Sequence, residues 1–186
     1  MTEHRSVLVP YDRLPGWVER FSARHGEPVV VRDGSRLTLT SPDGAEASYA
    51  EAPPPSDFGV VLVRRGGYAV GFVTDGALVA HKAGTRYVQG QTKAGGWSQQ
   101  RYARRRANQA DALVGACADV VRRLVPEGAL VFGGGDRPLF TAVLEHSRTP
   151  LLPAQRWLDV GDPKHVALQK AVVDARAYEV TLNALA

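Results

Sequence analysis

The chain has 186 residues, of which 44% are hydrophobic and 23% charged, a balance typical of a soluble globular protein rather than a disordered one. This length allows one domain of ordinary size, alone or with a small additional module, and either arrangement can bury a substantial core. No apolar stretch has the length of a membrane span, and the N-terminus lacks the pattern of a signal peptide. We therefore expect a cytoplasmic protein with no membrane partner.

The formal net charge of +4 conceals an uneven distribution. Residues 76–110 contain no Asp or Glu, and we call this segment the basic strip. Lys and Arg number 23 in all, so outside the strip the chain keeps 16 basic residues against 19 acidic ones. Such a concentration is typical of a surface that binds a polyanion, most often a nucleic acid, although a solvated helix face is the alternative. The seven positive residues of the strip are Lys82, Arg86, Lys93, Arg101, Arg104, Arg105 and Arg106.

The first 52 residues have the pattern of a small α+β unit. A helix is predicted from Pro15 to Gly26, because proline favours the first turn and glycine the end of a helix. Two short strands are expected around Asp33-Gly34, a common hairpin turn. Three consecutive prolines then exclude both helix and strand, so residues 53–57 are interpreted as a proline-rich linker between this unit and a second domain of residues 58–186.

The second domain begins with a predicted meander of three antiparallel strands. Residues 58–65, 68–74 and 77–82 are rich in β-forming side chains, and the two-residue turns Gly66-Gly67 and Asp75-Gly76 connect them. A long helix is then expected over residues 99–125, with a basic first half and the apolar 3–4 spacing of a buried face in its second half.

After this helix, strands and helices alternate. Residues 128–135 predict a buried strand, and the next helix has Asp136 as its N-cap and Pro138 in its first turn. Residues 156–160 predict another strand, and 163–182 a closing helix. The expected fold class is therefore α/β, a mixed sheet with helices on its faces, preceded by the small α+β unit.

Conventional catalytic and metal-binding patterns are weak. Cys117 lies in an apolar helical stretch and is expected to be a buried structural residue rather than a nucleophile. Asp159 and Asp162 could approach a magnesium ion at the end of a strand, but the cap of the last helix explains Asp162 as well, and we favour it. No pair of histidines has ligand spacing, so no metal site and no cofactor are predicted; the histidines are His4, His25, His81, His146 and His165.

The three glycines of residues 133–135 stand between a predicted strand and a predicted helix. Such a place can hold an anion at the helix N-terminus. The segment lacks the Lys-Ser/Thr of a P-loop and the second half of a dinucleotide fingerprint, so a tight turn is the favoured interpretation.

Residues 95–106, "GGWSQQRYARRR", resemble the catalytic loop and following helix of the central domain in eukaryotic and archaeal class-one release factors. In those proteins a Gly-Gly-Gln tip is followed by Ser and then by an Arg-aromatic-Ala-Arg run. The flanking segments are also similar, so the resemblance covers roughly residues 58–186. It is strongest with the actinobacterial rescue release factors, which are related to the tRNA-cleaving enzyme of eukaryotic ribosome quality control. The positions in step are Gly95, Gly96, Ser98, Arg101, Tyr102, Ala103, Arg104 and Arg106.

The catalytic glutamine does not occupy its usual position in this sequence, because Trp97 stands there. The rescue branch has a Gly-x-x-Gln pattern instead, and residues 96–99 fit it. The resemblance therefore carries the catalytic role to Gln99, on a loop containing Gly95 and Gly96. Gln100 is the adjacent competitor, placed about 100° away if both lie in the helix.

The resemblance implies a ribosome-rescue peptidyl-tRNA hydrolase, a monomer whose partners are the large ribosomal subunit, ribosomal RNA and peptidyl-tRNA. A neutral amide can position water and stabilise the developing oxyanion, and paired glycines let the backbone approach RNA. Phosphate contacts and base stacking are expected along the helix, although Tyr102 could equally pack on the sheet. The expected RNA-binding residues are Lys93, Trp97, Ser98, Arg101, Tyr102, Arg104, Arg105 and Arg106.

Two alternatives remain for the function. The relative in eukaryotic quality control cleaves a phosphodiester, so an endonuclease acting near the tRNA acceptor end is one. A non-catalytic module that binds the ribosome or RNA is the other. Fifty-two N-terminal residues hold neither a stop-codon domain nor a GTPase-recruiting domain, which favours rescue over ordinary termination.

Overall fold

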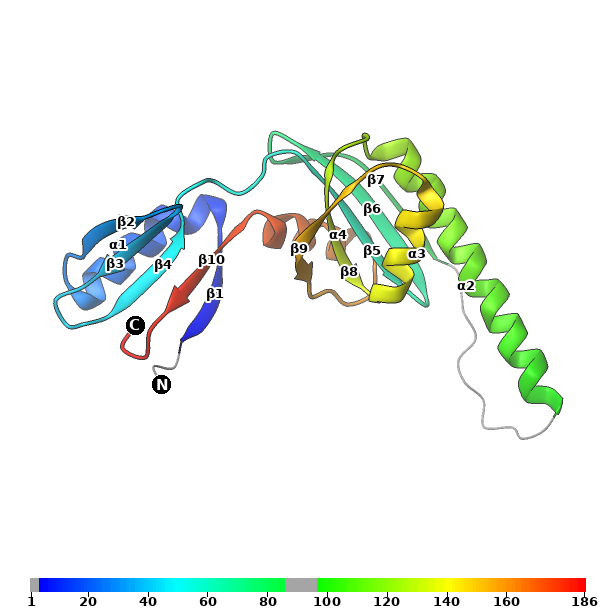
Figure 1. The fold of residues 1–186 in the computed structure, drawn as a ribbon, viewed down its shortest axis with the longest axis horizontal. Coiled ribbons are helices and arrows are strands. Elements are labelled where there is room, and N and C mark those ends of the chain that lie inside the picture. The colour runs from blue at the N-terminus through cyan, green and yellow to red at the C-terminus, as the bar shows by residue number, and fades with distance from the viewer. Residues whose placement is uncertain (1–3, 86–96) are drawn as a thin grey trace. The chain divides into compact units, whose positions relative to one another are not determined.

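The computed structural model describes residues 4–85 and 97–186, with only the backbone described for residues 97–106. The chain forms two compact units (Figure 1). The first unit combines Met1–Pro55 with Arg176–Ala186, and the second is Ser56–Ala175.

The first unit is a five-stranded antiparallel sheet with one helix. The strand order is β1-β10-β4-β3-β2. Helix α1 covers the sheet with Phe21, which is packed among buried side chains of the strands, including Leu39 and Val180. The elements are β1 (Arg5–Pro10), the 3-10 turn η1 (Tyr11–Arg13), α1 (Leu14–His25), β2 (Val29–Asp33), β3 (Arg36–Thr40), β4 (Glu46–Ala50) and β10 (Ala177–Leu182).

Local chemistry fixes the predicted parts of this unit. Helix α1 has Pro15 in its first turn and ends before Gly26. The φ of Gly26 is 87°, a positive value that glycine adopts readily and other residues rarely do. The predicted hairpin is confirmed, but Asp33 pairs with Arg36, so its loop is Gly34-Ser35, one residue later than the sequence suggested.

The closing helix predicted over residues 163–182 is wrong in its second half. Helix α4 spans His165–Ala175, and the chain then enters β10, which lies between β1 and β4 in the first unit. Residues 178–182 alternate between buried Tyr178, Val180 and Leu182 and more exposed positions, the period of a strand. The unit Ser56–Ala175 is therefore shorter at its C-terminal end than the domain of residues 58–186 expected from the sequence.

The second unit is an α/β fold around a mixed five-stranded sheet, as predicted. The strand order is β7-β6-β5-β8-β9, in which β5, β6 and β7 form the antiparallel meander while β8 and β9 run parallel to β5. The elements are β5 (Phe58–Arg64), β6 (Gly67–Thr74), β7 (Ala77–Thr85), α2 (Trp97–Leu124), β8 (Leu130–Gly135), α3 (Arg137–Ser147), β9 (Leu152–Leu158) and α4 (His165–Ala175).

Two short turns join the strands of the meander. Asp75 and Gly76 have φ of 51° and 76°, both in the left-handed region that a tight hairpin of this type requires. The other turn is Arg65-Gly66 rather than Gly66-Gly67, because Gly67 already pairs with Arg64.

Helices cover both faces of this sheet. Alternate residues of the central strand β5 point to opposite sides: Val61 and Val63 pack with α2 and α3, whereas Val60 and Leu62 pack with α4. The second unit therefore has three layers, with α2 and α3 on one face and α4 on the other.

The glycines before α3 belong to strand β8 itself rather than to a turn after it. A Cβ on Gly133 would lie 2.5 Å from Trp157 Cζ3 and 2.8 Å from Phe140 Cε2, so only glycine leaves room for these rings. The predicted helix cap follows directly, since the Asp136 side chain accepts a hydrogen bond from Leu139 N at 3.1 Å. The packing of the two rings explains the glycines, and the helix cap explains Asp136, so neither feature requires an anion at this place.

Candidate functional site

Helix α2 is fixed in the core by its second half. Leu113, Cys117 and Val121 are completely buried, and with their neighbours they pack against the sheet and α3. Among residues 107–124, Leu113 is the first buried position, whereas Ala107 and Asn108 are exposed. Within residues 107–124 the helix therefore changes from exposed and half-buried positions to buried ones, the direction of change that its sequence predicts.

The first half of α2 carries most of the predicted site. At 1.5 Å per residue, residues 97–112 extend for roughly 24 Å, and Figure 1 shows this part of α2 continuing past the sheet. Gly95, Gly96 and Lys93 lie outside the described residues. The structure brings the other predicted site residues together on one helical backbone: Trp97, Ser98, Gln99, Gln100, Arg101, Tyr102, Arg104, Arg105 and Arg106.

The helical repeat places these positions relative to the buried stripe. Each residue advances by about 100°. Gln99 is 18 residues before Cys117, about five whole turns, so it lies in line with that buried position. Gln100 is about 100° from this line. The backbone positions of Arg101, Arg104 and Arg105 lie about 120–160° from it, on the opposite side of the helix.

The helix begins at Trp97, so both candidate glutamines lie in its first turn. The first four N–H groups of a helix lack acceptors within the helix, and its dipole makes this end partly positive. The start of α2 is therefore a helix end that favours negative groups.

Strand β7 brings the chain to the start of the undescribed residues. Its Gly84 pairs with Tyr68 of β6, and a Cβ on Gly84 would lie 2.6 Å from Tyr68 Cζ. Lys82 pairs with Val70, whose side chain packs with α2, so Lys82 lies on the face of the sheet that α2 covers. Sequence reasoning missed the role of Gly84, although a glycine across from an aromatic residue is a known signal of close packing.

Cys117 is the buried structural residue that the sequence predicts. Its side chain is inaccessible to solvent, and burial raises the pKa of its thiol to about 12. Since the thiolate is the nucleophilic form, this cysteine is not equipped for nucleophilic catalysis.

Residues 4–85 and 97–186 contain no group of three or more His, Cys, Asp or Glu residues able to hold a metal ion. The rings of His81 and His165 lie 4.5 Å apart but form only a pair. Asp159 and Asp162 are both exposed. The proposed cap role of Asp162 is wrong, because α4 begins three residues later at His165, and the Asp162 carboxylate instead lies 3.7 Å from Lys164 Nζ.

A comparison with protein families identifies the family of the chain. The sequence profile of the Actinobacteria/chloroflexi VLRF1 release factor family matches residues 56–181. The chain belongs to this family. The match covers the whole second unit, Ser56–Ala175, and it extends into β10. A comparison with curated proteins gives no match.

Membership gives the chain a release-factor role in ribosome rescue. No helix in the described part of the chain is long and apolar enough to cross a membrane. The segment that resembles the release-factor pattern in the sequence, residues 95–106, lies within the region that the family profile covers.

Proposed function

We propose that this protein releases nascent chains from stalled ribosomal complexes by hydrolysing the ester bond of peptidyl-tRNA, with Gln99 as the catalytic residue. The observation that carries the proposal is a Gly-x-x-Gln segment at the start of a long helix in a release-factor family member. The second half of this helix is buried in the core, and this packing anchors the helix whose first turn carries Gln99.

The chemistry suits an uncharged side chain. The ester is already an activated acyl group, so the protein must mainly orient a water molecule and stabilise the oxyanion that forms. A glutamine amide has both a donor and an acceptor for these tasks, and it brings no charge into a site crowded with RNA phosphates. The preceding Gly95 and Gly96 allow the backbone to approach the tRNA end closely.

The helical phase separates Gln99 from three of the four arginines in the first half of α2, whereas Arg106, seven residues later, lies within about 20° of the Gln99 line. Arg101, Arg104 and Arg105 occupy the side of the helix opposite the Gln99 line. Phosphates of ribosomal RNA or of the tRNA acceptor end could bind these arginines without competing for the position of the glutamine. Trp97 and Tyr102 are the aromatic residues available for stacking on unpaired bases.

The decisive test is a release assay on stalled ribosomal complexes that carry labelled peptidyl-tRNA. We expect Gln99→Ala to lower the release rate at least 10²-fold, a loss like that of one oxyanion-hole donor, while co-sedimentation with large subunits is retained. The matched control is Gln100→Ala, which should stay within a few-fold of the unchanged protein. Equal loss in both variants would refute the assignment to Gln99.

The ends of the product tRNA identify the bond that is broken. An intact CCA terminus is expected, because ester hydrolysis leaves the tRNA whole. A shortened terminus would replace the proposal with the acceptor-end endonuclease. Co-sedimentation without any turnover would replace it with the non-catalytic ribosome-binding module.

A second test addresses the arginines. Arg101→Gln/Arg104→Gln should weaken binding to ribosomal RNA and reduce the slope of log affinity against log salt by about 1.4 to 1.8, since each phosphate contact contributes roughly 0.7 to 0.9. Arg122→Gln/Arg123→Gln, at the other end of the same helix, removes the same charge and should leave the slope unchanged. Equal effects of the two pairs would mean that only net charge matters.

A further inference from the structure

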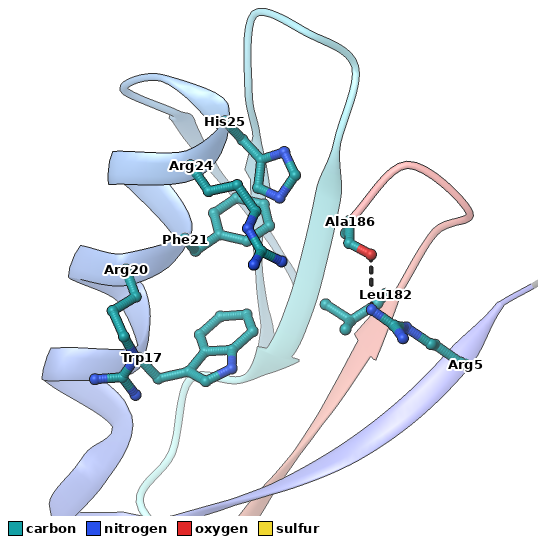
Figure 2. Close-up of a pocket in the computed structure, with 8 residues that line it drawn as sticks. All are labelled: Arg5, Trp17, Arg20, Phe21, Arg24, His25, Leu182 and Ala186. Carbon is teal, nitrogen blue, oxygen red and sulfur yellow. Dashed lines mark hydrogen bonds between the residues drawn. The ribbon is translucent and has the colours of Figure 1, made fainter.

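The first unit contains a pocket of about 230 Å³ that the release-factor chemistry does not use. Figure 2 shows side chains of α1 on one side of it and Arg5, Leu182 and Ala186 on the other. We call it the α1 pocket. Its lining combines an aromatic pair, Trp17 and Phe21, with the cations Arg20 and Arg24.

The spacing of α1 brings these four residues onto one side of the helix. Trp17, Arg20, Phe21 and Arg24 follow at i, i+3, i+4 and i+7, which are neighbours on a helical surface. Phe21 is 6% exposed and belongs to the core, and the Trp17 ring stacks on it with 5.5 Å between centroids and 18° between planes. The half-buried Trp17 is thus a supported aromatic surface at the edge of the core.

The positive charge of Arg20 and Arg24 is not balanced by any side chain of the lining, which contains three arginines and no Asp or Glu. Met1–Pro55 and Arg176–Ala186 together carry seven Lys or Arg residues against nine Asp or Glu residues, so the unit as a whole is acidic. Within the described residues, neither Arg20 nor Arg24 forms a hydrogen bond or an ion pair. A concave site with a positive charge attracts anions.

Neighbouring polar groups are already engaged. Arg5 Nη2 donates to the Ala186 carbonyl oxygen at 2.8 Å. His25 Nδ1 lies 2.8 Å from Asp43 Oδ2, and the same carboxylate accepts a hydrogen bond from Ala45 N at 3.0 Å. Asp43 therefore does not pair with Arg20 or Arg24, and both guanidinium groups remain available to a ligand.

We propose that the α1 pocket binds one nucleotide of a single-stranded RNA, with the base against Trp17 and adjacent phosphates bound by Arg20 and Arg24. Aromatic rings and guanidinium groups are the usual partners of unpaired bases and of the backbone in such sites. An acidic peptide would use the arginines but not the indole of Trp17. The family's work at the ribosome places RNA within reach, and the proposal does not depend on how the ester is hydrolysed.

The size of the pocket favours one unit of a longer chain. Pockets for small molecules and cofactors are usually about 300–1,000 Å³, and this one is smaller. A single base or phosphate group fits that volume, while the rest of the RNA would continue over the surface.

The test is fluorescence anisotropy with a labelled single-stranded oligonucleotide of ten uridines and the full chain carrying Arg101→Gln/Arg104→Gln/Arg105→Gln, which lowers binding by α2. Arg20→Gln/Arg24→Gln should weaken binding at least tenfold and reduce the salt slope by about 1.4, at roughly 0.7 per phosphate of a single strand. The control Arg13→Gln/Arg32→Gln removes two arginines of the same unit that do not line the pocket, and should stay within twofold.

Trp17→Leu tests the base, because it keeps an apolar side chain but removes the ring; we expect a loss of about fivefold or more. Circular dichroism of each variant shows whether the unit is folded. Equal loss in the two arginine pairs, unchanged affinity of folded Trp17→Leu, or competition by polyglutamate equal to that by RNA would each overturn the proposal. Competition by UMP much weaker than by the oligonucleotide is expected, and equal competition would overturn the assignment to an RNA chain.

Discussion

Cys117 offers a direct measurement of how firmly α2 is held in the core. The thiol is inaccessible to solvent, and its pKa is raised to about 12 by burial. At pH 8 a thiol of pKa about 8.5 is roughly one quarter thiolate, whereas a pKa of about 12 leaves about one part in 10⁴. The thiolate fraction of Cys117 is therefore lower than that of an ordinary thiol by a factor on the order of 10³. Exclusion of the reagent from the core slows labelling further.

The assay is alkylation by iodoacetamide at pH 8, followed by mass spectrometry. We expect the folded protein to react at least 10³-fold more slowly than a matched exposed thiol on the same helix, supplied by Ala107→Cys in a Cys117→Ala background. Labelling should become rapid in urea. A rate for Cys117 within tenfold of that control would refute the buried anchoring of α2.

Two further results follow from the same burial. Cys117→Ala should keep the proposed peptide release within about twofold of the unchanged protein, because the buried thiol is not equipped for catalysis. The unfolded chain releases the thiol proton at lower pH than the folded chain, so the contribution of this group to stability is complete below about pH 8.5 and is lost as pH rises toward 12.

Three substitutions test the packing around the site, each by urea unfolding followed through the fluorescence of Trp157 in a Trp17→Phe/Trp97→Phe background, which removes the other two tryptophans. Gly84→Val should destabilise the second unit by about 1–3 kcal/mol, because its Cβ would lie 2.6 Å from Tyr68 Cζ, and Tyr68→Ala in the same chain should recover part of the loss. Asp136→Ala should cost about 0.5–2 kcal/mol through loss of the α3 cap, with Asp136→Asn nearly neutral. Leu113→Ala should cost about 2–5 kcal/mol, and a cost below 1 kcal/mol would contradict its burial.

Local signals were sufficient for much of the second unit. The Asp75-Gly76 turn requires positive φ at both positions, so its sequence alone indicates a hairpin. Asp136 followed by Pro138 likewise fixes the start of α3. The change from polar to apolar spacing within α2 is equally visible, because helical periodicity depends only on neighbours within a few turns.

Non-local pairing limited the rest. Strands β1 and β4 were not predicted, and β10 was assigned to a helix. The reason is that β10 pairs with both β1 and β4, which are far away from it in the sequence. Helix α4 ends at Ala175, with Arg176 before β10, and neither glycine nor proline stands at this junction. The β-forming residues Tyr178 and Val180 were the available signal, but their pairing partners decide the outcome.

The α1 pocket was hidden for the same reason. Trp17, Val18 and Phe21 have the 3–4 spacing of an apolar helical face, and they lie in or against the core of the first unit. It could not indicate that Arg5 from β1 and Leu182 from β10 would complete a cavity beside this helix, because those contacts exist only once the sheet has formed.

The division of α2 into two halves also explains how a strongly basic segment can be helical. Arg101, Arg104 and Arg105 stand at i, i+3 and i+4, where like charges destabilise an isolated helix by about 0.2–0.5 kcal/mol per pair. Short solvated helices are also marginal without packing. The buried half, beginning at Leu113, supplies an already formed turn from which the helix extends. Phosphates bound to these arginines would relieve their mutual repulsion, so binding to RNA and the order of the helix that carries Gln99 would strengthen each other.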